Sequence, residues 1–245
     1  QPNAMGGREV GGQANQLAAH MEFSETEIDR VARFWQAKTI ARQPGLKAID
    51  MFEAIHDGTI KAVWIMATSP VDSLPNANKI KLALEKCEFV AVSDIMEETD
   101  TSVYADVKLP ALGWGEKNGT VTNSERRISR QKQLVPAPGN AKPDWWIMCE
   151  VAKAMGFHSQ FDYQHVSEIF KEHAKLSAFE NDHQNGKHAF DLSGLSQMDV
   201  EAYNSLKPIQ WPVTPSNPTG TERLFSDNQF FTPNGKAQMV ATDPR

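Results

Sequence analysis

The segment that decides the fold is AVWIMATSPVDSLPNANKIKLALEKCEFVAVSD, residues 62–94. Short apolar runs lie near its two ends, at residues 62–66 and 89–92. Runs of this length that are apolar on both faces are typical of buried parallel strands. Between them, residues 76–86 predict a helix because their apolar side chains fall on one side. The segment therefore predicts a strand, a helix and a second strand.

A third strand is predicted over residues 105–109, after a short helix that begins near Thr99. The alternation of strands and helices is the pattern of an α/β fold with a doubly wound, mainly parallel sheet flanked by helices. We therefore expect residues 1–110 to form an α/β region. Residues 111–245 are expected to form a smaller mixed region of strands, helices and a C-terminal hairpin.

Two helices are expected before the first strand. The clearer one covers residues 24–37, where Ser24 and Glu27 form a capping box ahead of an apolar stripe. Pro44-Gly45 then breaks the chain, and a second helix follows with Gly58 as its stop signal.

The mixed region has weaker patterns. In chain order we expect exposed strands at residues 120–122 and 128–133, a helix after Pro143 with the apolar stripe Met148, Val151, Ala152 and Met155, helices near 164–175 and 197–206, and a hairpin at Pro233-Asn234-Gly235.

The composition excludes several classes of protein. A net charge of −6 argues against nucleic acid and anionic membranes as partners. Cys87 and Cys149 are the only cysteines, so a disulfide framework, a zinc ribbon or an iron–sulfur cluster within this chain is not expected. No apolar run approaches the roughly 20 residues that span a bilayer. Neither GxGxxG nor GxxxxGK[ST] occurs, which removes the main support for nicotinamide or P-loop nucleotide binding.

Polar residues follow the predicted strands at the edge of the sheet where α/β proteins bind ligands. Ser93-Asp94 comes directly after the second strand, and Ser69 follows the first. A carboxylate at Asp94 is able to accept two hydrogen bonds from a ribose or from the edge of a guanine. The competing interpretation is that Asp94 only caps the following turn. Spacing alone leaves both interpretations open.

Several other charged residues also have both a ligand-binding and a purely structural interpretation. Lys117 lies in a Gly-containing turn, where it either neutralises a phosphate or is simply solvated. The basic residues between 126 and 132 suit an anionic cofactor, an acidic neighbouring domain or a solvated edge strand. Glu53 with His56 and His165 with Glu168 are i, i+3 pairs, but of these two only the first has the Glu-x-x-His order of a di-metal bundle site, so metal binding is not expected.

Several segments, taken in order, resemble the molybdopterin oxidoreductase family, whose members carry a bis-(molybdopterin guanine dinucleotide) molybdenum cofactor. The segments are QPNAMGGREVG at residues 1–11, the stretch 69–76, Val92-Ser93-Asp94, ADVKLP at 105–110, EKNGT at 116–120, NSERR at 123–127, AKPDWW at 141–146 and FTPNGKA at 231–237. The first is similar to the nitrate reductase branch, and the set is closest to the catalytic subunit of bacterial assimilatory nitrate reductase. Residues 157–222 contribute nothing to the resemblance.

The resemblance implies roles for single residues and makes residues 1–110 a cofactor-binding region. Ser93 and Asp94 match positions that hold a guanosine end of the cofactor. Lys117 and Asp144 match other cofactor-contacting positions, and Gln1 matches a position close to the pterin. Ser69 stands where the family often has Asn before Pro, so its contact is in doubt.

The resemblance also implies that this chain is an internal piece of a larger cytoplasmic enzyme that reduces nitrate to nitrite. Its partners would be nitrate, an electron donor and the remaining domains of the parent chain. The iron–sulfur cluster and the protein ligand to molybdenum would lie upstream, and a barrel domain downstream. We therefore expect the isolated chain to bind no molybdenum, carry no iron–sulfur cluster and reduce no nitrate.

Alternatives remain at this stage. One alternative is that the parent protein is a formate dehydrogenase or another oxidoreductase of the family. A second alternative is that it is a non-catalytic scaffold that kept the fold. No general acid, base or nucleophile is predicted, because the cofactor carries the chemistry. Arg8 either helps to steer an anion toward the metal or forms a salt bridge with Glu9 or another carboxylate.

Overall fold

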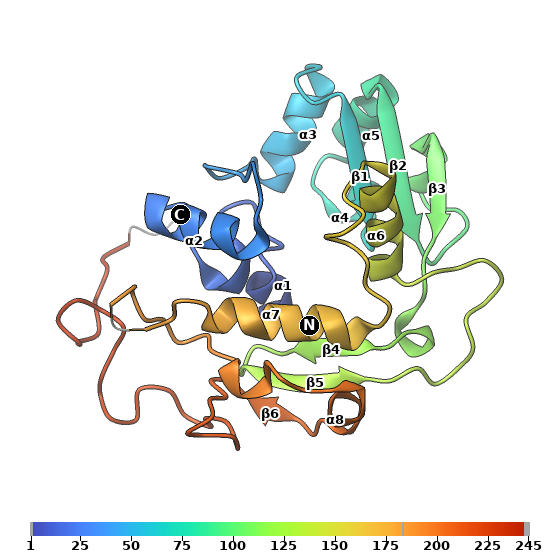
Figure 1. Ribbon diagram of the computed structural model, residues 1–245. Coiled ribbons are helices and arrows are strands. Elements are labelled where there is room, and N and C mark those ends of the chain that lie inside the picture. The colour runs from blue at the N-terminus through green and yellow to red at the C-terminus, as the bar shows by residue number, and fades with distance from the viewer. Residues whose placement is uncertain (1, 183, 243–245) are drawn as a thin grey trace. The chain divides into compact units, whose positions relative to one another are not determined.

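A computed structural model describes residues 2–182 and 184–242, and the chain divides into two compact units (Figure 1). The first unit consists of Gln1–Gln43, Thr120–Arg130 and Ser167–Arg245, and the second of Pro44–Gly119 and Gln131–Val166. The expected boundary at residue 110 therefore does not coincide with a division between the units. Packing joins segments that are distant along the chain, and a change of composition does not reveal this.

The second unit contains the predicted parallel sheet, with strands in the order β1-β2-β3. They are β1 (Ala62–Met66), β2 (Phe89–Asp94) and β3 (Val107–Pro110). Both pairings are parallel, with Ala62 beside Phe89 and Ala91 beside Val107, so the parallel α/β prediction is confirmed. Because the spatial order follows the sequence, these three strands wind in one direction.

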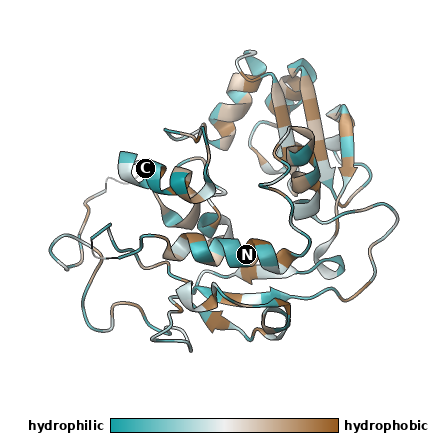
Figure 2. Cartoon of the chain, viewed as in Figure 1, coloured by the Kyte–Doolittle hydropathy of each residue, from teal (hydrophilic) through white to brown (hydrophobic). Residues whose placement is uncertain are grey.

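Helices connect the strands and complete a single apolar core. They are α3 (Ala48–His56), α4 (Pro70–Ser73), α5 (Ala77–Lys86) and the 3₁₀ turns η2 (Ser102–Tyr104) and η3 (Trp114–Glu116). Helices α3 and α5 pack together, and both contribute to the core around β1 and β2. The buried core residues are Phe52, Ile55, Ile65, Val71, Ile80, Ala83, Leu84, Val90 and Val92. In Figure 2 the strands of this sheet are mostly brown, and β2 is the strand that is buried along most of its length.

Helix α6 (Asp144–Ala154) begins where the sequence predicts but turns a different face inward. Its buried residues are Ile147 and Cys149, whereas Met148 is 43% exposed and Met155 is 70% exposed. The predicted apolar stripe is therefore wrong as a buried face. Residues 145–149 are apolar without interruption, so hydrophobic periodicity cannot select one side of this helix.

The first unit combines a small sheet with helices. Its elements are α1 (Ala4–Glu9), η1 (Ala18–His20), α2 (Glu25–Trp35), β4 (Gly119–Thr122), β5 (Arg127–Gln131), α7 (Val166–Ala178), η4 (Ser193–Leu195), α8 (Val200–Ser205) and β6 (Ile209–Gln210). The strand order is β4-β5-β6, and β5 pairs antiparallel with β6. Strands β4 and β5 were expected to be exposed, but Thr122 and Ile128 are buried. Ile128 lies beside Ile209 of β6, and Thr122 bonds to Asn3 and Glu9, which the short polar runs do not indicate.

Helix α2 begins at the capping residues that the sequence predicts. Its N-cap is Ser24, whose hydroxyl accepts from the backbone N–H of Glu27. Glu27 in turn accepts from the Ser24 hydroxyl and from the backbone N–H of Glu22. The predicted cap is thus present, with Glu22 taking the backbone contact that an ideal capping box gives to the N-cap residue.

The C-terminal segment contains the predicted turn without a hairpin. Gly235 has a φ of +66°, and its N–H donates to the carbonyl of Thr232 at 3.0 Å. The described residues on either side of this turn form no strand. Met239 is 93% exposed, so the apolar run after the turn has no sheet against which to pack.

Within the described ranges, every helix is too short or too polar to cross a bilayer.

Candidate cofactor-binding site

Asp94 lies at the mouth of a cavity of about 510 Å³ in the second unit. The cavity is formed where β2 and β3 end, by the chain after β3 and by the loop at 138–141. The backbone carbonyl of Asp94 accepts from Ala111 at 2.9 Å, which fixes the end of β2 against the chain leaving β3. This is the carboxyl end of a parallel sheet, where α/β proteins place their ligands.

The loop on the other side of the cavity is held by backbone hydrogen bonds. Lys142 donates to Pro110 at 3.1 Å and accepts from Leu112 at 3.1 Å, so the chain at 142 runs beside the end of β3. Ala141, just before it, is buried, and Gly139 has a positive φ of 48°. The cavity wall is therefore a defined backbone structure anchored to the sheet.

Carboxylates dominate the charge of the cavity. Asp94, Glu97 and Glu116 line it, and Lys108 is the one basic residue among the lining positions that the structure describes. Oδ1 of Asp94 accepts from the N–H of Met96 at 3.0 Å, and Oε2 of Glu116 accepts from the N–H of Gly113 at 2.6 Å. The remaining carboxylate lone pairs are suited to donors from a ligand, whereas a phosphate would be repelled.

These features fit the guanine end of a dinucleotide. A guanine base is uncharged and offers N–H donors on one edge, which is the complement of a carboxylate. The cavity volume lies within the roughly 300–1,000 Å³ that is usual for small-molecule sites. Both interpretations of Asp94 thus have support, because one oxygen makes the turn and the other oxygen is left for a ligand.

Ser93 points away from this cavity. It is fully buried, and its hydroxyl accepts from the indole nitrogen of Trp64 at 2.9 Å. Successive residues of a strand face opposite sides, so Ser93 and Asp94 cannot both line the same cavity wall. The cofactor role of Ser93 stays a prediction.

Ser69 is the N-cap of α4, beyond the end of β1. Its hydroxyl hydrogen-bonds to the carboxylate of Asp72 and to the hydroxyl of buried Thr101 at 2.9 Å. It does not line the Asp94 cavity. Its single hydroxyl already has two partners, so its cofactor contact also stays a prediction.

Lys117 and Asp144 are brought together by the fold. Their side chains form an ion pair of 2.5 Å, and each is about one quarter exposed, at 23% and 26%. Asp144 also lies in the first turn of α6, where the helix dipole stabilises a negative charge. The pair is accessible enough to meet a ligand, but neither residue lines the Asp94 cavity. Gln1, the remaining predicted site residue, lies outside the described residues.

The basic residues near 126 have structural partners. Arg126 donates to the backbone carbonyls of Trp211, Thr221 and Glu222 and lies over the Trp211 ring. Its guanidinium therefore holds the chain at 211–222, so we assign it no anion. No group of three potential metal ligands occurs among the described residues.

A buried polar cluster in the first unit was not anticipated. Glu9 is 3% exposed, and Trp211 and Thr122 donate to its two carboxylate oxygens. His20 packs on Phe190 beside this cluster, and burial lowers its pKa. The partners of Glu9 are more than one hundred residues away in sequence, so no local signal identifies them.

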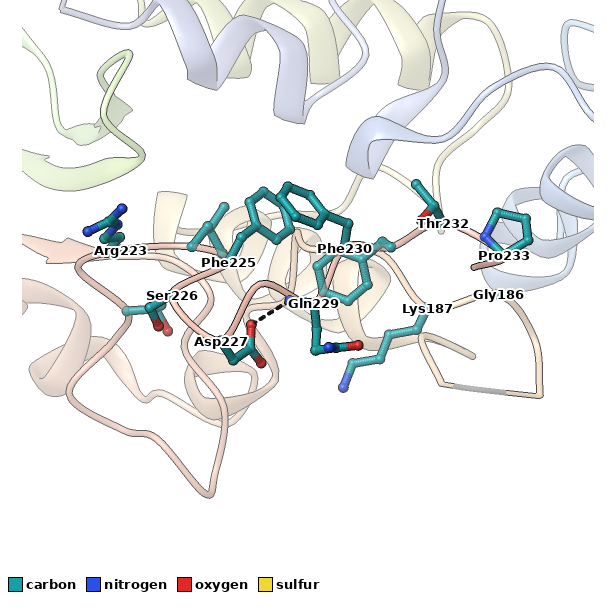
Figure 3. A pocket seen from close by; sticks show the side chains of 13 residues that line it. Gly186, Lys187, Arg223, Phe225, Ser226, Asp227, Gln229, Phe230, Thr232 and Pro233 are labelled. Atoms are coloured by element: carbon teal, nitrogen blue, oxygen red, sulfur yellow. Dashed lines mark hydrogen bonds between the residues drawn. The ribbon is translucent and has the colours of Figure 1, made fainter. Parts of the chain in front are cut away.

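A larger cavity of about 770 Å³ lies in the first unit (Figure 3). Phe225 and Phe230 stack there with ring centroids 4.6 Å apart, and Lys187 and Arg223 lie at the edges. Loops form its walls, and none of the predicted site residues lines it. We therefore place the candidate site at Asp94.

Comparison with known proteins agrees with the resemblance seen in the motifs. A nitrate reductase of Klebsiella oxytoca is 50% identical over 245 residues, which are 100% of this chain and 27% of that protein. A nitrate reductase of Shewanella frigidimarina is 51% identical over 242 residues, 98% of this chain and 26% of that protein. The solved acetylene hydratase of Pelobacter acetylenicus has a similar fold, with a TM-score of 0.50, 19% identity, and coverage of 91% of this chain and 24% of that one.

The chain spans about a quarter of the length of these curated relatives. The family model described as molybdopterin oxidoreductase matches residues 5–154, which is more than half of the chain. The chain belongs to the molybdopterin oxidoreductase family.

Proposed function

We propose that the Asp94 cavity holds the guanine end of a molybdopterin guanine dinucleotide, and that the parent protein reduces nitrate to nitrite. The observation that carries the first part is a carboxylate-lined cavity at the carboxyl ends of β2 and β3. The second part rests on membership of the family and on relatives named nitrate reductase at 50% and 51% identity.

The residues of this chain would bind and orient the cofactor. Asp94 accepts from the guanine edge with the oxygen that is not used by Met96. The Lys117–Asp144 pair offers a donor and an acceptor, already aligned, to another polar group of the cofactor. When bound, the cofactor supplies two-electron oxygen-atom transfer at molybdenum, and the protein supplies binding, orientation and electrostatics. We assign no proton transfer to any residue of this chain.

Arg8 is our candidate for contact with the nitrate anion. Its side chain is exposed on α1, and among the described residues it forms no ion pair. The alternative salt bridge with Glu9 is not formed, because the Glu9 carboxylate is occupied by Trp211 and Thr122. A free guanidinium is well suited to a planar oxyanion, since its donors form a rigid fork.

Nucleotide binding to the purified chain tests the cavity directly. We expect GMP to shift amide signals at residues 94–97 and 111–116 in a titration followed by nuclear magnetic resonance. AMP lacks the donor edge of guanine, so it should bind at least about tenfold more weakly. Equal affinity for the two nucleotides, or shifts confined to other residues, would contradict the assignment.

The reaction is tested on the full-length parent. In one assay reduced viologen donates electrons and nitrate consumption is measured. In a second assay of the same preparation oxidised viologen accepts electrons and formate oxidation is measured. Turnover of nitrate without formate oxidation is the expected result. The reverse result would place the parent among the formate dehydrogenases.

A further inference from the structure

Thr122 holds both ends of helix α1. Its backbone N–H donates to Oδ1 of Asn3 at 3.0 Å, and its hydroxyl donates to Oε2 of Glu9 at 2.8 Å. Thr122 is 3% exposed at the end of β4, so both bonds are made in a buried strand end. We call Asn3, Glu9 and Thr122 the Thr122 clamp. The clamp ties the two ends of a six-residue helix to one residue of the sheet.

Glu9 is the buried charge in this clamp. Its other oxygen accepts from the indole nitrogen of Trp211 at 2.6 Å, and Nε2 of His173 lies 3.8 Å from Oε2. A buried carboxylate without donors would be strongly destabilising, whereas one with two short hydrogen bonds is retained. Glu9 therefore cannot turn outward to pair with Arg8 without leaving two buried donors unsatisfied.

Three glycines in and next to the clamped segment lie where there is no room for a side chain. A Cβ on Gly6 would lie 1.9 Å from Oδ1 of Asn3, and one on Gly12 would lie 2.8 Å from the carbonyl oxygen of Gly7. Gly11 has a φ of +72° and approaches the backbone N of Ala18. Gly11 and Gly12 are thus packed against backbone and Gly6 against the Asn3 side chain, so a side chain at any of the three would meet atoms already in place.

Arg8 lies inside this clamped segment and is exposed. Its carbonyl accepts from the N–H of Gly11 at 3.1 Å and from the side chain of Gln16, so its backbone is fixed while its guanidinium remains available. We infer that Thr122 and Glu9 are positioning residues that hold α1 so that Arg8 meets the nitrate anion. This inference rests on the proposed nitrate reduction.

The test compares three substitutions. Thr122→Val keeps the shape and the backbone bond to Asn3 but removes the hydroxyl that donates to Glu9. Thr122→Ser keeps a hydroxyl at this position, so it should keep the hydrogen bond to Glu9 and behave like the wild type. Ser177→Ala is the matched control, because the Ser177 hydroxyl is also buried in the first unit and, among the described residues, bonds to Ala174 and Leu192 and not to the clamp.

Hydrogen exchange of the purified chain shows whether the clamp exists. Thr122→Val should speed exchange of the backbone amides of Gly7, Val10 and Gly12 by about tenfold, since a hydrogen bond to a charged group is lost. Thr122→Ser and Ser177→Ala should leave these amides near the wild-type rate. Unchanged exchange in Thr122→Val would overturn the clamp.

Kinetics of the full-length parent show whether the clamp acts through Arg8. Arg8→Gln should raise KM for nitrate, and Thr122→Val should raise it by about three- to tenfold with little change in kcat. In the Arg8→Gln background, Thr122→Val should add less than about twofold, because the two changes remove the same contact. Additive effects, or an equal rise of KM in Ser177→Ala, would overturn the positioning role. If the wild-type parent reduces no nitrate, the proposed function fails and the positioning role fails with it, while the exchange result still decides the clamp.

Discussion

The indole nitrogen of Trp64 donates to the hydroxyl of Ser93 at 2.9 Å, linking neighbouring parallel strands of the second unit. Ser93 is fully buried, so its hydroxyl has no water with which to replace this partner. The same residue was expected to meet the cofactor. Ser93 therefore has either a structural role through Trp64 or a role in cofactor binding, and the two roles predict different effects of substitution.

We predict that Ser93→Ala lowers the free energy of unfolding by about 1–2 kcal/mol, because it leaves the part-buried indole N–H of Trp64 without its acceptor. In a Trp64→Phe background the same change should cost less than half as much, since the shared bond is already gone. Urea unfolding of the four chains measures both numbers. A drop in GMP affinity of tenfold or more at unchanged stability would instead give Ser93 the cofactor role.

Asp94→Asn should weaken binding of GMP to the chain, and of the cofactor to the parent, by about one to two orders of magnitude. The variant keeps the size but loses a charge and one acceptor, worth roughly 1.5–3 kcal/mol. Stability should change little, because an Asn oxygen can still accept from Met96. Asp57→Asn is the matched control, since Asp57 makes the same turn with the N–H of Thr59 in the same unit. Full affinity in Asp94→Asn removes the residue from the site, and a collapsed melting temperature favours a purely capping role.

Arg126→Lys should destabilise the first unit by about 1–3 kcal/mol although the charge is retained. A lysine ammonium cannot reproduce a planar fork that reaches three carbonyls and lies over the Trp211 ring. Arg127→Lys is the neighbouring control, because Arg127 forms an exposed pair with Glu125 at 3.1 Å. Equal melting temperatures for the two variants would show that the contacts of Arg126 contribute nothing.

Stability should fall as the pH drops below about 6.5. Burial lowers the pKa of His20 and of His188 from the ordinary value of 6.5, so the unfolded chain binds more protons below that pH. Glu9, His173 and Arg8 act on His20 as charges, and the depression by burial is the largest effect. The stabilisation is thus complete above pH 6.5 and is lost as the pH falls toward the depressed values.

Thermal unfolding between pH 5 and pH 8 measures this dependence. The slope of melting temperature against pH should be smaller in His20→Phe, which keeps the ring against Phe190 but has no proton to gain. His158→Gln, at an exposed histidine, should keep the wild-type slope. A wild-type slope in His20→Phe would exclude His20 as a source of the acid sensitivity.

The limits of helices and strands could be predicted from the sequence wherever the apolar residues of an element mark one buried face or form a short buried strand. The parallel strands, both ends of α2 and α5, and the C-terminal end of α3 fall within a residue or two of their predicted limits. Asp94 was singled out because the carboxyl end of a buried strand is a general ligand position, and its contact with the cofactor stays a prediction. The apolar face of α6 was predicted incorrectly, since an unbroken apolar run has no preferred side.

Features that depend on distant partners could not be predicted. Burial of Glu9 requires Thr122 and Trp211, which lie 113 and 202 residues further along the chain. The cavity needs the loop at 138–141 to return beside β3. Neither pairing leaves a trace in local periodicity or composition, because both are properties of the folded backbone.

The interleaved composition of the two units has a consequence during synthesis. All segments of the second unit have left the ribosome once residue 166 has emerged, whereas the first unit still lacks α7, α8 and β6. Until Trp211 is synthesised, the carboxylate of Glu9 lacks the indole N–H that is one of its two hydrogen-bond donors. All residues of the second unit are therefore synthesised before the contacts that hold α1 can form, although α1 itself is synthesised early.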